Sequence, residues 1–356
     1  MLRFNRRRAE EGCGVPRRIA GTRRTMRFGE CMAVALVMAT AAGMYACGGA
    51  AEPPLRIAII QWIGYQPVHL ARSQDDWPDG EMRVAEFASN TESLRAFRNG
   101  NVEVAALTLD EALLLRADGH DIRIILVMDY SHGADTIVAQ REIESLADLE
   151  GRRVGVENSA ATAYLLARGL EHAGLDTSAV EVVRVNAGRH VQAFREGEVD
   201  ALATFEPIRS RLLEDGAREL FDSTLIPGEI VDVLVVDSEA MEVHRGHLQQ
   251  LLETWFEGLG VLEAEPGRAR DVMAERGGLT AAELDRALGG VEFPSVAENC
   301  QLLAHDGEAL QGTTRRLADL MEAYGLLPRE ITPEGLFDDR FVQALGCPQH
   351  DPGDRP

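Results

Sequence analysis

The chain has 356 residues, of which 45% are apolar and 26% charged, a composition typical of a globular protein with room for two domains. Its formal net charge is −22, and all 36 basic residues are arginine. Because a balance this negative repels polyphosphate, the composition argues against nucleic acid as a partner.

The first 46 residues differ from the rest of the chain in charge. They hold nine arginines and three acids, and the basic run ends at Arg27. An uncharged apolar stretch then extends from Cys31 to Cys47. This stretch is shorter than the roughly 20 residues that a membrane-spanning helix needs. The order of basic, apolar and small residues predicts an export signal over 1–46, cleaved between Ala46 and Cys47.

The end of this signal, Met44-Tyr45-Ala46-Cys47-Gly48-Gly49, resembles a bacterial lipoprotein signal, although Met44 stands where leucine is usual. The resemblance implies that Cys47 becomes lipid-modified and anchors the mature chain to a membrane. Three alternatives stay open. They are an ordinary export signal with an incidental cysteine, a twin-arginine signal at 22–25, and a mis-assigned start before Met26.

Residues 47–54 are small or turn-forming and are predicted to be a tether. Apolar runs then alternate with segments of helical periodicity, which predicts an α/β fold with mostly parallel sheets. We expect strands at 55–60, 82–87, 102–108, 122–128, 136–139, 153–156, 180–185, 199–204 and 230–236. We expect the intervening helices at 91–98, 109–117, 160–173, 190–195 and 208–214.

Beyond residue 238 helical periodicity dominates, with helices expected at 239–265, 266–276, 280–289, 295–303 and 307–324. Two α/β units followed by a helical third predict two lobes, with the chain crossing near 136–140 and returning near 231–238. We expect lobe 1 to consist of 55–138 and 238–345, and lobe 2 of 139–237. Residues 346–356 are predicted to be a disordered tail.

Several short segments, at matching order and spacing, resemble one family. They are 62–67 (WIGYQP), 94–105 (LRAFRNGNVEVA), 129–135 (DYSHGAD), 146–156 (LADLEGRRVGV), 197–201 (GEVDA) and Glu206-Pro207. The family is that of the substrate-binding proteins of ABC importers for nitrate, sulfonates and taurine, which also includes binders of thiamine-precursor pyrimidines. The resemblance implies a type II periplasmic-binding-protein fold, in which two α/β lobes are joined by two crossing strands. The two lobes close on a ligand that lies between them.

The same resemblance implies a function. We expect a monomeric periplasmic protein that captures a small molecule and delivers it to the permease and ATPase of an ABC importer. It would need no cofactor and no metal, and it would not be an enzyme.

Ligands of open α/β sheets bind beyond the carboxyl ends of strands, and this rule selects the candidate site residues. Aromatic rings could stack on a planar ligand or form a plug between the lobes. Hydroxyls and amides could bind ligand or cap helices, and carboxylates could bind ligand or be structural. The candidates are Trp62, Gly64, Tyr65, Ser89, Asn90, Thr108, Asp110, Ser131, Asp135, Asn158, Ser159, Thr162, Phe205, Glu206 and Asp232.

Four of these candidates are acids, namely Asp110, Asp135, Glu206 and Asp232, and few arginines accompany them, Arg189 being one. An unpaired buried carboxylate beside a nitrate or sulfonate would be costly. We therefore expect a neutral or cationic ligand, planar or amine-bearing, in preference to a small anion.

Two rival functions are a sensor that signals to a membrane partner and a thiamine-pyrimidine synthase-like enzyme. The enzyme would need clustered cysteines, but beyond the signal only Cys47, Cys300 and Cys347 remain. His244 and His247 form an H-x-x-H pair with no third ligand nearby, which favours surface histidines over a metal site. Cys300 and Cys347 either pair or remain free thiols.

Overall fold

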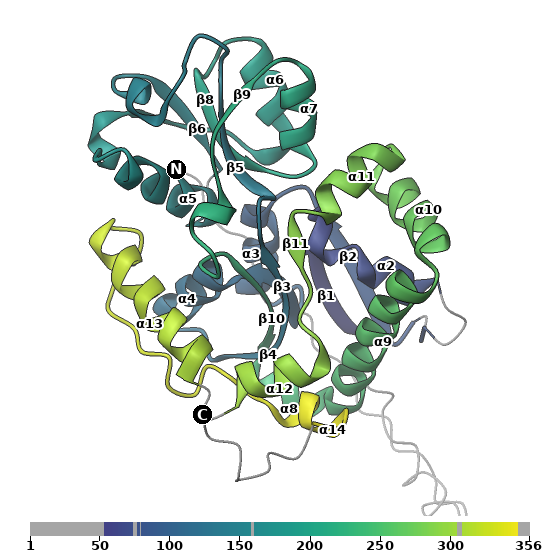
Figure 1. Ribbon diagram of the computed structural model, residues 1–356. Coiled ribbons are helices and arrows are strands. Elements are labelled where there is room, and N and C mark those ends of the chain that lie inside the picture. The colour runs from purple at the N-terminus through teal and green to yellow at the C-terminus, as the bar shows by residue number, and fades with distance from the viewer. Residues whose placement is uncertain (1–52, 74–76, 79, 158–159, 305–307, 348–356) are drawn as a thin grey trace, which may run out of the picture. The chain divides into compact units, whose positions relative to one another are not determined.

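The computed structural model describes residues 53–73, 77–78, 80–157, 160–304 and 308–347. The predicted export signal with Cys47, the candidates Asn158 and Ser159, and most of the predicted tail lie outside these residues. Figure 1 shows that the described part of the chain is built on two β-sheets with helices packed against them. We call the elements around the first sheet lobe 1 and those around the second sheet lobe 2.

The first sheet has the strand order β11-β4-β10-β3-β1-β2. Its strands are β1 (Leu55–Ile60), β2 (Met82–Phe87), β3 (Val104–Thr108), β4 (Ile122–Ser131), β10 (Val231–Asp237) and β11 (Val291–Glu292). The strand β1 pairs in parallel with β2 and β3, whereas β10 is antiparallel to both β3 and β4. Nearly all side chains of β1, β3, β4 and β10 are buried, as expected for strands that are covered on both faces.

Helices cover both faces of the first sheet (Figure 1). On one side α4 (Leu109–Asp118) packs against α13 (Glu308–Ala323), and on the other α2 (Pro67–Arg72) packs against α9 (Arg245–Ala264). The helix that follows β2, α3 (Asn90–Arg98), begins at Ser89, whose hydroxyl accepts the N–H of Glu92. The remaining helices of this lobe are α8 (Ser238–Val243), α10 (Pro266–Gly277), α11 (Ala281–Leu288), α12 (Val296–Leu303) and α14 (Arg340–Ala344).

The second sheet has the strand order β7-β6-β8-β5-β9. Its strands are β5 (Asp135–Ala139), β6 (Arg153–Val156), β7 (Glu181–Arg184), β8 (Ala201–Phe205) and β9 (Arg218–Asp222). The strand β6 is parallel to β7 and β8, and β5 lies antiparallel between β8 and β9. Its main helices are α5 (Ala160–His172), α6 (His190–Arg195) and α7 (Ile208–Glu214).

The chain passes between the two sheets twice, at 132–134 after β4 and at 223–230 before β10. Both passages come a few residues earlier than the sequence predicts. The predicted range 139–237 for lobe 2 ends after β10, whereas β10 pairs in the first sheet. An apolar run such as IVDVLVV predicts a buried strand but carries no information about its pairing partner.

Two features of the helical part differ from the prediction. The expected helix 239–265 is two helices, α8 and α9, separated at His244, whose backbone is not helical. His244 is buried at this junction, so the prediction of a surface position for it is wrong. Among the described residues no group of three metal-ligating side chains accompanies His244 and His247.

Cys300 of α12 and Cys347 form a disulfide bond, which resolves the alternative that the sequence left open. The bond ties the end of the described chain to α12. Within the described residues no helix is both long enough and apolar enough to cross a membrane.

Candidate functional site

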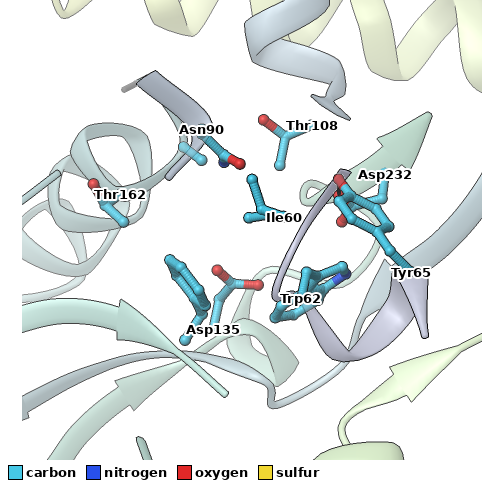
Figure 2. Close-up of a pocket in the computed structure, with 10 residues that line it drawn as sticks. Ile60, Trp62, Tyr65, Asn90, Thr108, Asp135, Thr162 and Asp232 are labelled. Atoms are coloured by element: carbon cyan, nitrogen blue, oxygen red, sulfur yellow. Dashed lines mark hydrogen bonds between the residues drawn. The ribbon is translucent and has the colours of Figure 1, made fainter. Parts of the chain in front are cut away.

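A cavity lies where the two lobes face each other. It is lined from lobe 1 by Ile60, Trp62, Tyr65, Asn90, Thr108 and Asp232, and from lobe 2 by Asp135, Ala161, Thr162 and Phe205. Figure 2 shows these side chains arranged around a common space. The open volume is about 20 Å³, which is room for about one water molecule. A solute of more than a few atoms therefore requires the lobes to part before it can enter.

The lobe 1 side of the cavity is built on strand ends, because β1 ends at Ile60, β3 ends at Thr108 and β10 begins beside them. The sheet register places Asp232 opposite both Thr108 and Asp129. Two aromatic side chains are fixed by these carboxylates. Trp62 Nε1 donates to Asp129 Oδ1 at 3.1 Å, and the Tyr65 hydroxyl donates to Asp232.

The lobe 2 side presents a carboxylate and a ring. Asp135 and Phe205 are paired in register at the ends of β5 and β8. The ring of Phe205 meets that of Trp62 edge to face, with centroids 5.9 Å apart, so the two rings touch across the cavity. Figure 2 shows the carboxylate of Asp135 beside Trp62. The contact between the rings of Trp62 and Phe205 corresponds to the aromatic plug that the sequence left as an alternative to ligand stacking.

A third contact between the lobes lies at the start of α3. The side chain of Glu157, which follows β6, is fully buried and faces this helix end. Its Oε1 accepts the N–H of Thr91 at 3.4 Å, and its own N–H donates to Thr162 Oγ1 at 2.9 Å.

The carboxyl groups in and around the cavity have no basic neighbour in its lining. Asp135 and Asp232 are the acids of the lining, and none of the described residues that form it is an arginine or a histidine. Further buried acids stand behind the lining, namely Asp110, Glu111, Asp129 and Glu157. Burial raises the pKa of Asp135 to about 7 and that of Asp129 to about 8, with the neighbouring carboxylates adding to both shifts. The pKa of Asp232 is raised well above its usual value for the same reasons.

These raised pKa values predict a stability that falls as pH rises. Between pH 6.5 and 8 the folded protein keeps protons on Asp129 and Asp135 that the unfolded chain, with carboxyl pKa values near 3.8, has released. Each excess proton lowers the free energy of unfolding by about 1.4 kcal/mol per pH unit. Two buried histidines oppose the trend most strongly below pH 6.5 and only weakly near pH 8, because burial lowers the pKa of His69 and of His190 to about 4 from 6.5.

Urea unfolding of the ligand-free protein at pH 6.5, 7.2 and 8 measures this trend. We expect the midpoint to decrease with pH and the decrease to be smaller in Asp129→Asn. A midpoint that stays constant or rises over this window contradicts the assignment of raised pKa values to the site.

Eight of the predicted site residues line the cavity: Trp62, Tyr65, Asn90, Thr108, Asp135, Thr162, Phe205 and Asp232. The other described candidates have supporting contacts instead. Gly64 packs against Asp129 and Trp62, and Ser89 caps α3. Ser131 contacts Ser223 Oγ and accepts the N–H of Asp135. Asp110 is buried in the first turn of α4.

Two predicted residues lie away from the cavity lining. Glu206 is buried, but it accepts from Arg209 and Ser210 at the start of α7. Arg189, considered as a counter-charge, pairs with Glu198 at 2.9 Å, and both side chains are largely exposed. Among the residues that the structure describes, the lining therefore contains no cation to offset its acids.

The sequence reasoning missed Ile60 and Ala161 in the lining and three of the buried acids behind it, Glu111, Asp129 and Glu157. Asp129 directly follows the predicted strand 122–128, and Glu157 directly follows 153–156. The rule that ligand sites lie at strand ends would have selected both. Ile60 and Ala161 carry no chemical signal and are found only from the geometry.

Known proteins resemble the chain over most of its length. A protein of Escherichia coli K12 named as a candidate aliphatic sulfonates-binding protein is 25% identical over 230 residues, covering 62% of this chain and 72% of the relative. The solved alkanesulfonate-binding protein SsuA from Xanthomonas axonopodis pv. citri, bound to MOPS, superimposes with a TM-score of 0.68 at 22% identity. That match covers 80% of this chain and 97% of the other.

The desulfurization enzyme DSZB also shares the fold, with a TM-score of 0.59 at 16% identity, covering 82% of this chain and 98% of the enzyme. The fold alone therefore does not separate binding from catalysis. The relatives that match in sequence are named as binding proteins.

The sequence relatives and the two α/β lobes with a cavity between them together place this chain among the periplasmic solute-binding proteins. The chain belongs to the NMT1-like family, whose model matches residues 48–276.

Proposed function

We propose that this protein captures a small solute with a basic nitrogen, an amine or an amine-bearing planar ring, and delivers it to the permease of an ABC importer. The observation that carries the proposal is the charge of the cavity. Its ionisable lining consists of Asp135 and Asp232, with Tyr65 bound to the latter. A buried carboxylate without a cationic partner is costly, and a cationic ligand would provide that partner.

The aromatic side chains support the same ligand class. The rings of Trp62 and Phe205 meet across the cavity, and a solute that enters between the parted lobes would lie against both. Aromatic faces attract cations and stack on flat rings. Hinge closure would then bring Asp135 of one lobe and Asp232 of the other to the same ligand.

The names of the relatives favour a different ligand, a sulfonate. SsuA from Xanthomonas binds MOPS, which carries a sulfonate group, and a further relative is named a taurine-binding periplasmic protein. A sulfonate in this cavity would face two carboxylates with no arginine in the lining. We give the charge of this chain's own cavity more weight than the names of proteins that are about one quarter identical to it.

Isothermal titration calorimetry decides between the two ligand classes. The protein is titrated with a primary alkylamine and an aminopyrimidine, and separately with ethanesulfonate, propanesulfonate and nitrate, none of which carries a basic nitrogen. We expect saturable binding of at least one compound from the first group. Binding of the sulfonates or nitrate, with no heat from any amine, would overturn the proposal.

We also propose that Cys47 is lipid-modified and holds the protein at the outer side of a membrane, close to the importer. The support is the signal-like sequence before it and the small, turn-forming tether after it. Cells labelled with a fatty-acid analogue should yield labelled protein. The label should disappear in Cys47→Ala, and its persistence would refute the anchor.

A further inference from the structure

We propose that Glu157 is a specificity-determining residue that excludes anionic solutes from the cleft. Its carboxylate belongs to lobe 2 but lies at the N-terminus of α3 in lobe 1, where an anionic group of a ligand would otherwise bind. This inference rests on the proposed function, because it explains how the cleft would reject the anions that relatives bind.

The N-terminus of a helix attracts anions, because its first N–H groups have no partner within the helix and the helix dipole is positive there. In α3 the hydroxyl of Ser89 satisfies the N–H of Glu92. The N–H and the hydroxyl of Thr91 face Glu157 Oε1, at 3.4 and 3.5 Å. The protein thus supplies its own carboxylate to the donors at this helix end.

Two further observations connect this helix end with the ligand cavity. Asn90, the first residue of α3, lines the cavity and is 5% exposed, and its Oδ1 has no hydrogen-bond partner among the described residues. Thr162, which accepts the N–H of Glu157, also lines the cavity. The position of Glu157 is therefore next to the space that a solute would fill.

The carboxylate of Glu157 is stabilised by hydrogen bonds at the start of α3 and not by an ion pair with another described residue. It is fully buried, and its Oε2 has no partner among the described residues. The nearby Arg184 donates to the backbone carbonyl of Glu157, at 3.0 Å. The neighbouring acid is Glu111, whose pKa Glu157 helps to raise. A sulfonate or nitrate would have to displace Glu157 or lie beside it. Two negative charges side by side in a buried site repel each other strongly.

The test compares Glu157→Gln, which removes the charge and keeps the shape, with Glu157→Ala, which also empties the space. Glu198→Gln is the matched control, because it removes one carboxylate from an exposed position of the same lobe. Calorimetry with MOPS and with an aminopyrimidine is performed on the wild-type protein and all three variants, after thermal melting has shown that each is folded.

We expect both Glu157 variants to bind MOPS at least about tenfold more tightly than the wild type and Glu198→Gln do. MOPS affinities that are the same in all four proteins would overturn the role of Glu157. The aminopyrimidine titration of the wild type tests the proposed function separately, so the two ideas can fail independently. If Glu157→Ala does not fold, Glu157→Gln alone decides the outcome.

Discussion

Replacing Asp135 with asparagine is expected to lower the affinity for an amine ligand about 30-fold or more, which corresponds to at least about 2 kcal/mol. Asp135 lines the cavity, is 7% exposed, and has no basic partner in the lining. In the bound state it would pair with the cation of the ligand, and removing one member of a buried charge pair leaves the other member unpaired. Calorimetric titration of Asp135→Asn with the amine that binds the wild type measures the loss.

The same substitution should leave the ligand-free protein at least as stable as the wild type. Burial raises the pKa of Asp135, which means that its ionised form destabilises the folded state. Asparagine keeps the shape without the charge. Asp176→Asn is the control. Asp176 is an exposed N-cap residue outside the cavity lining, and asparagine caps a helix about as well as aspartate does. Unchanged affinity in Asp135→Asn would exclude this carboxylate from the ligand site.

Replacing Gly64 with alanine is expected to weaken both folding and binding. A Cβ atom at this position would lie 2.0 Å from Asp129 Oδ2 and 2.5 Å from Trp62 Nε1. It would separate the two groups whose hydrogen bond fixes Trp62 against Phe205. Overpacking and the loss of a buried hydrogen bond together predict a loss of about 2–4 kcal/mol in the free energy of unfolding.

Gly260→Ala is a matched control, because Gly260 lies in the middle of α9 and a Cβ there meets no atom within 4 Å. That change should be neutral or stabilising by up to about 1 kcal/mol. Urea unfolding and calorimetry on both variants measure the difference. A Gly64→Ala protein with wild-type stability would show that Trp62 and Asp129 are not held as the structure has them.

The fold was largely predictable from the sequence because its main elements carry strong patterns. Buried strands such as 122–128 are mainly apolar runs rich in β-branched residues, and helices such as α3 and α4 begin at the capping residues Ser89 and Thr108. The strand β9 was not predicted, because Arg218–Asp222 alternates only weakly between polar and apolar residues. The membership of β10 in the first sheet depends on tertiary pairing, which a local pattern does not encode.

The candidate site was predictable in part for a geometric reason. Parallel strands place their carboxyl ends at one edge, so residues at these ends converge, as Trp62 after β1 and Thr108 at the end of β3 do. Asp232 reaches the same edge from the start of the antiparallel strand β10. Some polar residues also follow strands but bind neighbouring residues and do not reach the cavity. Glu206, which follows β8 and pairs with Arg209, is an example. Which lobe surface Glu157 meets depends on how the lobes close, and no segment of the sequence shows that.

Native mass spectrometry of the protein, purified from cells without unfolding, tests the central claim most directly, because a tightly bound solute is retained and can be identified. We predict that the retained mass belongs to a compound with a basic nitrogen and that it is lost in Asp135→Asn. Retention of nitrate, of a sulfonate that carries no basic nitrogen, or of another compound without one would contradict the assignment of the cleft to amine ligands.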